Sequence, residues 1–205
     1  ESSEREMKPK TVKEVCKALI ELGFQPVRQK GSHIRFAHQD GRKTTVEALN
    51  KVGMGWCGHP SETEAGSVYY AQIDYKDAAF VCFQDITSRL DDEAAIELIR
   101  KIIPTVDFLI VSIHWGYEYK NKPDWSSQIE PGRAFIDAGA DFVIGHHPHV
   151  IQSFEIYKDK FIFYSLGNFV FDQYWSKNTQ EQLGLRIILD DADDIESFKT
   201  TVELI

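Results

Sequence analysis

The sequence predicts an α/β protein in which buried strands alternate with helices and the functional residues lie at the carboxyl ends of the strands. Three apolar runs of strand length carry this prediction, at residues 108–113, 142–144 and 160–164. Near-continuous apolar strands are typical of parallel sheets that helices cover on both faces. Polar residues follow each run, and ligands of such folds collect in the crevice beyond the carboxyl ends of the strands.

Two amphipathic segments between these strands are predicted to be helices. Residues 91–103 place apolar side chains on one face, with Asp91 or Asp92 as N-cap and Pro104 just beyond the end. Residues 130–138 have the same spacing and stop at Gly139, a plausible glycine for a left-handed helix terminus. The predicted order is therefore helix, strand and site, repeated along the chain.

The remaining elements are predicted from apolar spacing and turn residues. The expected helices are at 11–22 and 45–52. The expected strands are at 24–27, 34–38, 68–73, 78–83, 152–157, 183–189 and 197–204. A turn at 75–77 should join the 68–73 and 78–83 strands, and a hairpin turn at 158–159 should lead into the 160–164 strand.

Composition and charge limit the partners that the chain can have. The 205 residues carry a formal net charge of −9 and can form one domain of ordinary size with a substantial core. No run of 18 or more apolar residues occurs, so the chain as given is expected to be soluble. The three cysteines are widely spaced, which argues against a disulfide framework and indicates little about the compartment.

The charge is unevenly distributed along the chain. Residues 7–45 hold nine Lys/Arg against three Asp/Glu, whereas acidic residues predominate in the remainder. Such a distribution gives the body of the chain no reason to bind nucleic acid, while the basic head could.

Histidines carry the chemistry predicted for the strand ends. His146, His147 and His149 directly follow the second apolar run, and His114 and Glu118 follow the first. Imidazoles with a nearby carboxylate are a typical ligand set for divalent transition metals such as zinc, iron or manganese. An isolated histidine is usually an ordinary surface or core residue, but three imidazoles after a buried strand are a poor choice for packing alone.

Three sequence blocks resemble the signature of a known family. They read IHWGYEY at 113–119, DAGADFVIGHHPHV at 137–150 and YSLGNFVFD at 164–172. They are similar to the blocks of the CapA bacterial capsule-synthesis family, which is associated with poly-γ-glutamate capsules, and the likeness runs from about residue 45 to the end. That family resembles the calcineurin-like metallophosphatases. The resemblance therefore implies layered β-sheets flanked by helices, with a metal site on loops at the strand ends.

The resemblance also implies roles for individual residues. The matched positions are His114, Glu118, His146, His147, His149 and Asn168. His114, His147 and His149 would bind metal, although which two histidines of the G-H-H-P-H block face it is left open. His146 or Glu118 would act as general acid. Asn168 would orient a bound ligand or hold its loop. The implied cofactor is a divalent transition metal (Mn, Fe or Zn), in a dinuclear site or lost from this chain.

The early blocks of the family, a G-D carboxylate and an N-x-E segment, find no counterpart. The chain is therefore expected to be an N-terminally incomplete, carboxyl part of such a domain, in which a dinuclear site lacks a bridging ligand. The expected division places a small α-β-β head at residues 1–45 and the CapA-like body at residues 46–205.

The head invites two interpretations. Residues 7–46 are similar to the HicA toxin family, whose small α-β-β-β-α proteins cleave mRNA with the histidine of G-S-H, here His33. The last strand and helix of that module are not matched. In a degenerate CapA-like frame, the same Gly31-Ser32-His33 falls on an N-N-H metal motif. His33 is thus a candidate functional residue under both interpretations, as the catalytic residue in the first and as a metal ligand in the second.

Three functions are compatible with these patterns. The first is capsule (poly-γ-glutamate) synthesis or processing, with a metal-dependent hydrolase site acting on an anionic cell-surface polymer or a phosphoester. The second is a non-catalytic polymer-binding or scaffold domain of the same fold, and the third is RNA cleavage by the head. The resemblance implies capsule-synthesis partners in the membrane and a cell-surface or membrane-associated full-length protein. A cytoplasmic location and a homo-oligomer are left open.

Overall fold

The computed structural model describes residues 17, 20, 25–30, 33–37, 55–58, 67–73, 75–168, 173, 175–191 and 198–204. The chain divides into two compact units, Glu1–Trp56 and Cys57–Ile205.

In the first unit, β1 (Gln25–Lys30) pairs antiparallel with β2 (His33–Ala37), in agreement with the two strands predicted there. Lys17 and Ile20 are helical. The rest of the helix predicted at 11–22, and the one predicted at 45–52, lie outside the described residues.

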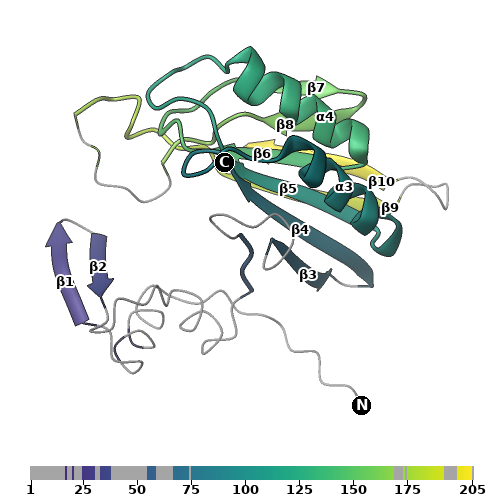
Figure 1. The fold of residues 1–205 in the computed structure, drawn as a ribbon, viewed down its shortest axis with the longest axis horizontal. Helices are drawn as coiled ribbons and strands as arrows, with labels where there is room; N and C mark the ends of the chain where they lie inside the picture. Colours follow the sequence, from purple (N-terminus) through teal and green to yellow (C-terminus); the bar gives the residue numbers. More distant parts are fainter. Residues whose placement is uncertain are drawn as a thin grey trace. The chain divides into compact units, whose positions relative to one another are not determined.

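A six-stranded sheet forms the centre of the second unit (Figure 1). Its strands are β3 (Val68–Ile73), β4 (Lys76–Gln84), β5 (Phe108–His114), β6 (Phe142–His146), β7 (Phe154–Tyr157) and β8 (Lys160–Phe163). In the spatial order β3-β4-β5-β6-β8-β7, the four inner strands run parallel and the two edge strands run antiparallel to them. The predicted parallel strands are confirmed, so the carboxyl ends of β4, β5, β6 and β8 share one edge.

Both predicted hairpins occur, but one turn lies elsewhere. Ile73 pairs with Lys76, so the chain reverses before Lys76 and the turn predicted at 75–77 was placed too late. Lys158 and Asp159 both have positive φ, at 51° and 62°. Two successive positive φ values are characteristic of the tight turn that suits the twist of a hairpin, here between β7 and β8.

Two helices cover one face of the sheet, α3 (Asp92–Ile102) and α4 (Glu130–Ala138) (Figure 1). The side chain of Asp91 caps α3 by accepting a hydrogen bond from the N–H of Ala94, and α4 ends at Gly139, as predicted. Short helical segments that the sequence did not predict are η1 (Ile103–Thr105) and η2 (Trp125–Ile129). Within the described part of the chain, no helix combines the length and apolar character needed to cross a membrane.

The opposite face of the sheet carries a second, smaller sheet. β9 (Leu185–Asp191) and β10 (Phe198–Leu204) pair antiparallel. Alternate residues of β5 face the two sides: Val111 packs with the helices, and Ile110 lies in a cluster with Leu185 and Ile187. Because β5 is apolar on both faces, it is buried between helices and a second sheet. The result is the layered, helix-flanked architecture expected from the sequence.

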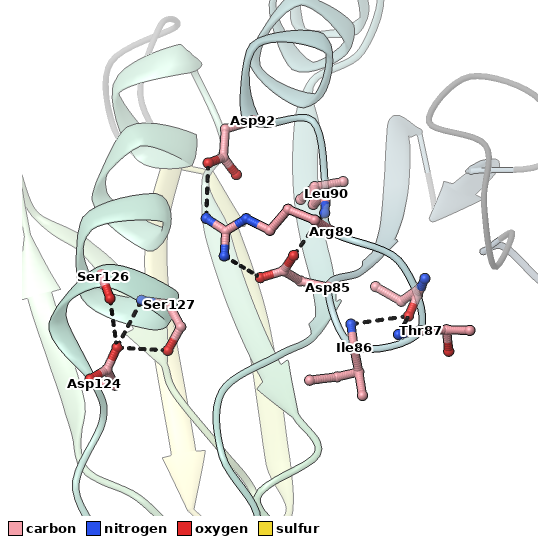
Figure 2. A network of polar contacts seen from close by, with 10 residues as sticks. Asp85, Ile86, Thr87, Arg89, Leu90, Asp92, Asp124, Ser126 and Ser127 are labelled. Atoms are coloured by element: carbon pink, nitrogen blue, oxygen red, sulfur yellow. Dashed lines mark hydrogen bonds and ion pairs between the residues drawn. The ribbon is translucent and has the colours of Figure 1, made fainter.

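The loop between β4 and α3 is tied to the end of β5. The N–H of Asp85 donates to the carbonyl of His114 at 2.8 Å. Figure 2 shows the Asp85 carboxylate held in turn by the N–H of Leu90 at 2.7 Å and by Arg89 at 3.3 Å. These contacts fix the backbone at the point where β5 delivers His114 to the edge of the sheet.

A disulfide that the sequence did not predict joins Cys57 to Cys82. Their Cα atoms lie 5.5 Å apart, which is within the range that disulfides span. The wide spacing of the cysteines argued against a disulfide framework, but it carried no information on whether two of them meet in space. The bridge ties the segment before β3 to the middle of β4.

Candidate metal centre

The histidines reach the edge of the sheet from two adjacent parallel strands. His114 ends β5 and His146 ends β6, and the two are partners in the ladder. His147 and His149 follow β6 in a loop where both have positive φ, at 103° and 61°. A residue other than glycine adopts such a conformation at a cost of about 1–3 kcal/mol, and such residues cluster at functional sites. The loop thus holds two imidazoles in a conformation that local preference disfavours.

Glu118, His147 and His149 form a group able to hold a metal ion. One ligand atom from each lies within 4.8 Å of the others. The His149 Nε2 is 3.9 Å from a carboxylate oxygen of Glu118. Glu118 is exposed, whereas both imidazoles are half-buried. One open side and two partly buried ligands would leave an ion accessible to substrate.

His114 supports this group through His147. The His114 Nε2 lies 3.0 Å from Nδ1 of His147. Burial, together with the neighbouring imidazoles, lowers the pKa of His114 to about 4. Burial also lowers the pKa of His147, although Glu118 opposes the shift. Both rings are therefore neutral at neutral pH, the form in which imidazole binds metal.

Asn168 selects the tautomer of His149. The Nδ1–H of His149 donates to Oδ1 of Asn168 at 2.7 Å. An imidazole whose Nδ1 carries the proton presents its lone pair on Nε2, and Nε2 is the atom on the Glu118 side. Hydrogen bonds of this kind orient metal-ligating histidines and raise their basicity.

The Asn168 amide is itself held in one orientation. Its Nδ2 donates to the carbonyl of Thr179 at 2.9 Å and to Oε1 of Gln173 at 3.2 Å. Gln173 in turn donates to the hydroxyl of Tyr119 at 3.2 Å, and the Tyr119 ring stacks on His149 with centroids 5.9 Å apart. These contacts form a closed network that begins and ends at His149.

A buried tryptophan fixes the strand ends below the site. Trp115 is fully buried. Its backbone N–H donates to the carbonyl of His146 at 3.0 Å, and its indole N–H donates to the carbonyl of Tyr164 at 2.9 Å. The indole passes so close to Gly145 that any Cβ there would collide with it and with Tyr164. Glycine is therefore required at this position of β6.

The loop that carries Glu118 is anchored by two buried amides. Gly116 has φ 78°, and a Cβ on it would lie 2.6 Å from the side chain of Gln128. The Gln128 Nε2 donates to Oε1 of Gln152 at 2.7 Å. The N–H of Tyr119 donates to the carbonyl of Pro148 at 2.8 Å, which joins the Glu118 loop to the histidine loop.

The structure describes the side chains of six of the seven candidate residues from the sequence. Six lie near one another at the carboxyl edge: His114, Glu118, His146, His147, His149 and Asn168. Of the G-H-H-P-H histidines, His147 and His149 belong to the ligand group, whereas His146 is half-buried at the end of β6. His33 opens β2 opposite Lys30, but its side chain lies outside the described part of the structure.

Several supporting residues could not have been singled out from the sequence. Gln128, Gln152, Gln173 and Tyr119 act through contacts between segments that lie far apart in the chain. Glutamine and tyrosine have no spacing signature of their own. Proximity to the H-W-G-x-E and S-L-G-N-F blocks was the only signal available for Tyr119 and Gln173.

Comparison with known sequences places the chain among capsule proteins. The family described as "Bacterial capsule synthesis protein PGA_cap" matches residues 2–173. The chain is 32% identical to the capsule biosynthesis protein CapA of Bacillus anthracis over 188 residues, covering 83% of this chain and 46% of that protein. It is 31% identical to the PGA biosynthesis protein CapA of Bacillus subtilis, covering 88% and 51% respectively. The chain thus spans about half the length of these relatives.

The family match has a consequence for the head. Its range includes residues 7–46, so the HicA-like interpretation of that segment is not supported. The competing CapA-like frame agrees with the matched range.

Solved structures of low sequence identity share the fold. A putative 5′-nucleotidase from Staphylococcus aureus aligns with a TM-score of 0.52 at 16% identity, covering 78% of this chain and 34% of that one. A hypothetical protein from Thermus thermophilus aligns with a TM-score of 0.50 at 8% identity, covering 80% and 81%. The fold is metallophosphatase-like, as the resemblance implied.

Proposed function

The chain belongs to the bacterial capsule synthesis family PGA_cap, and from this premise we propose that it synthesises or processes a capsule polymer through a metal-dependent hydrolase site. The single observation that carries the proposal is the convergence of Glu118, His147 and His149, whose ligand atoms lie within 4.8 Å of one another. These ligands stand at the carboxyl edge of a parallel sheet, where folds of this class bind their ligands.

The donor set fits a divalent transition metal. Both imidazoles have Nδ1 engaged, by His114 and by Asn168, so Nε2 is the ligand atom of each. Two imidazole nitrogens and one carboxylate oxygen suit zinc, iron or manganese. The proposed ligands are therefore His147, His149 and Glu118, with His114 orienting His147 or completing the coordination.

The residues around this centre would have different roles in a hydrolysis. A bound divalent ion supplies Lewis-acid polarisation of a phosphoryl or carbonyl oxygen. Asn168 keeps His149 in its binding orientation. Since Glu118 would be a ligand of the ion, His146, half-buried at the end of β6, is the candidate for proton transfer.

The proposed substrate is an anionic cell-surface polymer of the poly-γ-glutamate kind, with a phosphoester as the alternative. The names of the two Bacillus relatives support the first, and the nucleotidase-like fold neighbour supports the second. We further propose that the protein works with capsule-synthesis partners at the membrane or cell surface.

Hydrolysis of the two substrate classes tests this proposal. Purified protein would be supplied with Mn²⁺ or Zn²⁺ and either γ-linked polyglutamate or p-nitrophenyl phosphate. Turnover should vanish with chelator and fall at least about 100-fold in Glu118→Gln. Glu97→Gln, at an exposed position of α3, removes the same charge elsewhere and should leave turnover unchanged. Absence of turnover on both substrates with metal present would contradict a hydrolase.

One observation favours a second function, polymer binding without catalysis by the same fold. In the described residues, a single three-ligand group is present, and it contains one carboxylate. Such a set suits one ion, whereas hydrolysis by two ions needs a bridging ligand. Tight polymer binding without turnover in the same assay would identify this scaffold function.

A further inference from the structure

A pocket lies on the loop that carries Glu118. It has a volume of about 500 Å³ and is lined by Tyr117, Lys120, Asn121, Lys122, Pro123 and Asp124. These residues belong to the segment 116–124, which we call the lysine loop. Glu118 lies within the same loop, one residue beyond Tyr117. A molecule held in the pocket is therefore close to the proposed metal ligand.

Two lysines line the pocket on a chain that is acidic overall. Lys120 and Lys122 are exposed, and no described carboxylate lies within ion-pairing distance of either amine. The whole chain has a net charge of −9. Two cations without a partner carboxylate among the described residues create a local attraction for anions on such a surface.

Asp124, the acidic residue among the described residues that line the pocket, is hydrogen-bonded within its own turn. Figure 2 shows the Asp124 carboxylate directed at the start of η2, where it accepts hydrogen bonds from the hydroxyls of Ser126 and Ser127 at 3.0 and 2.8 Å. It also accepts one from the N–H of Ser127 at 3.0 Å. These hydrogen bonds lower the pKa of Asp124. Within the described residues, the Asp124 carboxylate is engaged by its own turn rather than by Lys120 or Lys122.

The backbone of the lysine loop is held in place by buried side chains. The Gln152 amide, 5% exposed, donates to the carbonyls of Lys120 and Lys122 at 2.8 and 3.2 Å. The N–H of Asp124 donates to Oε1 of the buried Gln128 at 3.1 Å. Because this loop is anchored in its free state, a ligand need not spend binding energy on ordering the backbone.

The composition of the pocket favours carboxylates over phosphates. Phosphate sites typically use the planar fork of arginine or the N–H groups of a helix N-terminus. None of the described residues that line the pocket is an arginine, and the nearby η2 terminus is capped by Asp124 itself. Lysine amines act as compact point charges, and the exposed Tyr117 ring offers apolar surface for the methylene groups between successive carboxylates.

We propose that the lysine loop is a subsite for a polymer that bears carboxylates at regular intervals, with Lys120 and Lys122 binding neighbouring carboxylates beside the metal centre. This inference rests on the proposed function and names the residues that would recognise its substrate.

Binding of a γ-linked glutamate oligomer, measured by titration calorimetry, tests the subsite. The variant Lys120→Gln/Lys122→Gln should bind the oligomer roughly tenfold more weakly, because two exposed charge pairs are lost. Lys120→Arg/Lys122→Arg keeps the charge and should restore binding to within about twofold. Arg100→Gln/Lys101→Gln, at exposed positions in the last turn of α3, removes the same charge elsewhere and should also bind within about twofold of wild type.

The titrations would be repeated on protein treated with chelator and with two other probes, free glutamate and a polyphosphate of similar length. The tenfold loss should persist without metal, and the oligomer should bind more tightly than either probe. Equal binding by the double glutamine variant, equal loss in the α3 control, or preference for free glutamate or polyphosphate would overturn the subsite. Wild-type binding of the oligomer with no turnover in the presence of Mn²⁺ or Zn²⁺ would overturn the proposed hydrolase and leave the subsite standing.

Discussion

The Nδ1 of His149 lies 2.7 Å from Oδ1 of Asn168, and this contact determines which nitrogen of His149 faces Glu118. The two residues come from separate blocks of sequence, and the structure joins them into one unit. The site therefore depends on a residue that does not itself belong to the ligand group.

Replacing Asn168 should weaken metal binding without unfolding the protein. Asn168→Ala removes the acceptor for His149, and loss of such a supporting hydrogen bond typically costs about 10- to 100-fold in metal affinity. Asn168→Asp keeps an acceptor oxygen and should stay closer to wild type. Metal titration with a competing chelator measures the effect. Identical affinities for Asn168→Ala and wild type would show that the contact does not orient the ligand.

Replacing Trp115 should destabilise the fold. Trp115→Phe removes the indole N–H and leaves the buried Tyr164 carbonyl with the longer 3.4 Å contact from the Gln128 amide, at a cost of about 1–3 kcal/mol in free energy of unfolding. Trp175 is 67% exposed, so Trp175→Phe should change that free energy by less than about 0.5 kcal/mol. Urea denaturation compares the two, and equal stabilities would contradict the role given to the indole.

Stability should depend on pH through Glu155. Burial acts to raise the pKa of Glu155, but hydrogen bonds from Arg133 and Tyr164 outweigh it and lower the pKa below its ordinary value of 4.5. The folded protein therefore binds the proton less readily than the unfolded chain. The resulting stabilisation is complete above pH 4.5 and is lost as the pH falls through the folded-state pKa.

Glu155→Gln should consequently lower the free energy of unfolding at pH 7 by about 1 kcal/mol and by less at about pH 3.5. Glu97→Gln, on the exposed side of α3, serves as the matched control and should show no such pH dependence. A deficit for Glu155→Gln that is the same at both pH values would refute the linkage.

Reduction should destabilise the second unit. The Cys57–Cys82 bridge closes a loop with a sequence separation of 25, and a loop of this length corresponds to about 3 kcal/mol. Thermal unfolding with and without a thiol reductant should reveal a lower midpoint in the reduced protein. Cys57→Ser/Cys82→Ser should unfold at that lower midpoint in both conditions, and a reductant effect that persists in this variant would exclude the bridge as its cause.

Much of the fold was predictable because its signals are local. The apolar runs that became β5, β6 and β8 are continuous, since each strand is buried on both faces. The cap at Asp91 and the stop at Gly139 are residue choices that act within one helical turn. The π-helical turn at η2 depends instead on the Asp124 cap and the buried Gln128, a combination that spacing does not reveal.

The candidate site was predictable in part for the same reason. Histidines directly after a buried strand are visible in sequence, but the division of labour among His146, His147 and His149 depends on positive φ values at the last two. The anchoring of the Glu118 loop by Gln128 and Gln152 joins segments 24 residues apart, and the Cys57–Cys82 bridge likewise arises only from the folded arrangement.

Elemental analysis of the purified protein tests the central claim, that Glu118, His147 and His149 hold a divalent metal, most directly. Protein prepared without chelator should contain about one equivalent of a divalent transition metal. His147→Ala/His149→Ala should lose it, while Lys177→Ala, at an exposed position, should retain it. Absence of metal from wild type after incubation with Mn²⁺, Fe²⁺ and Zn²⁺, or undiminished metal in the double variant, would contradict the claim.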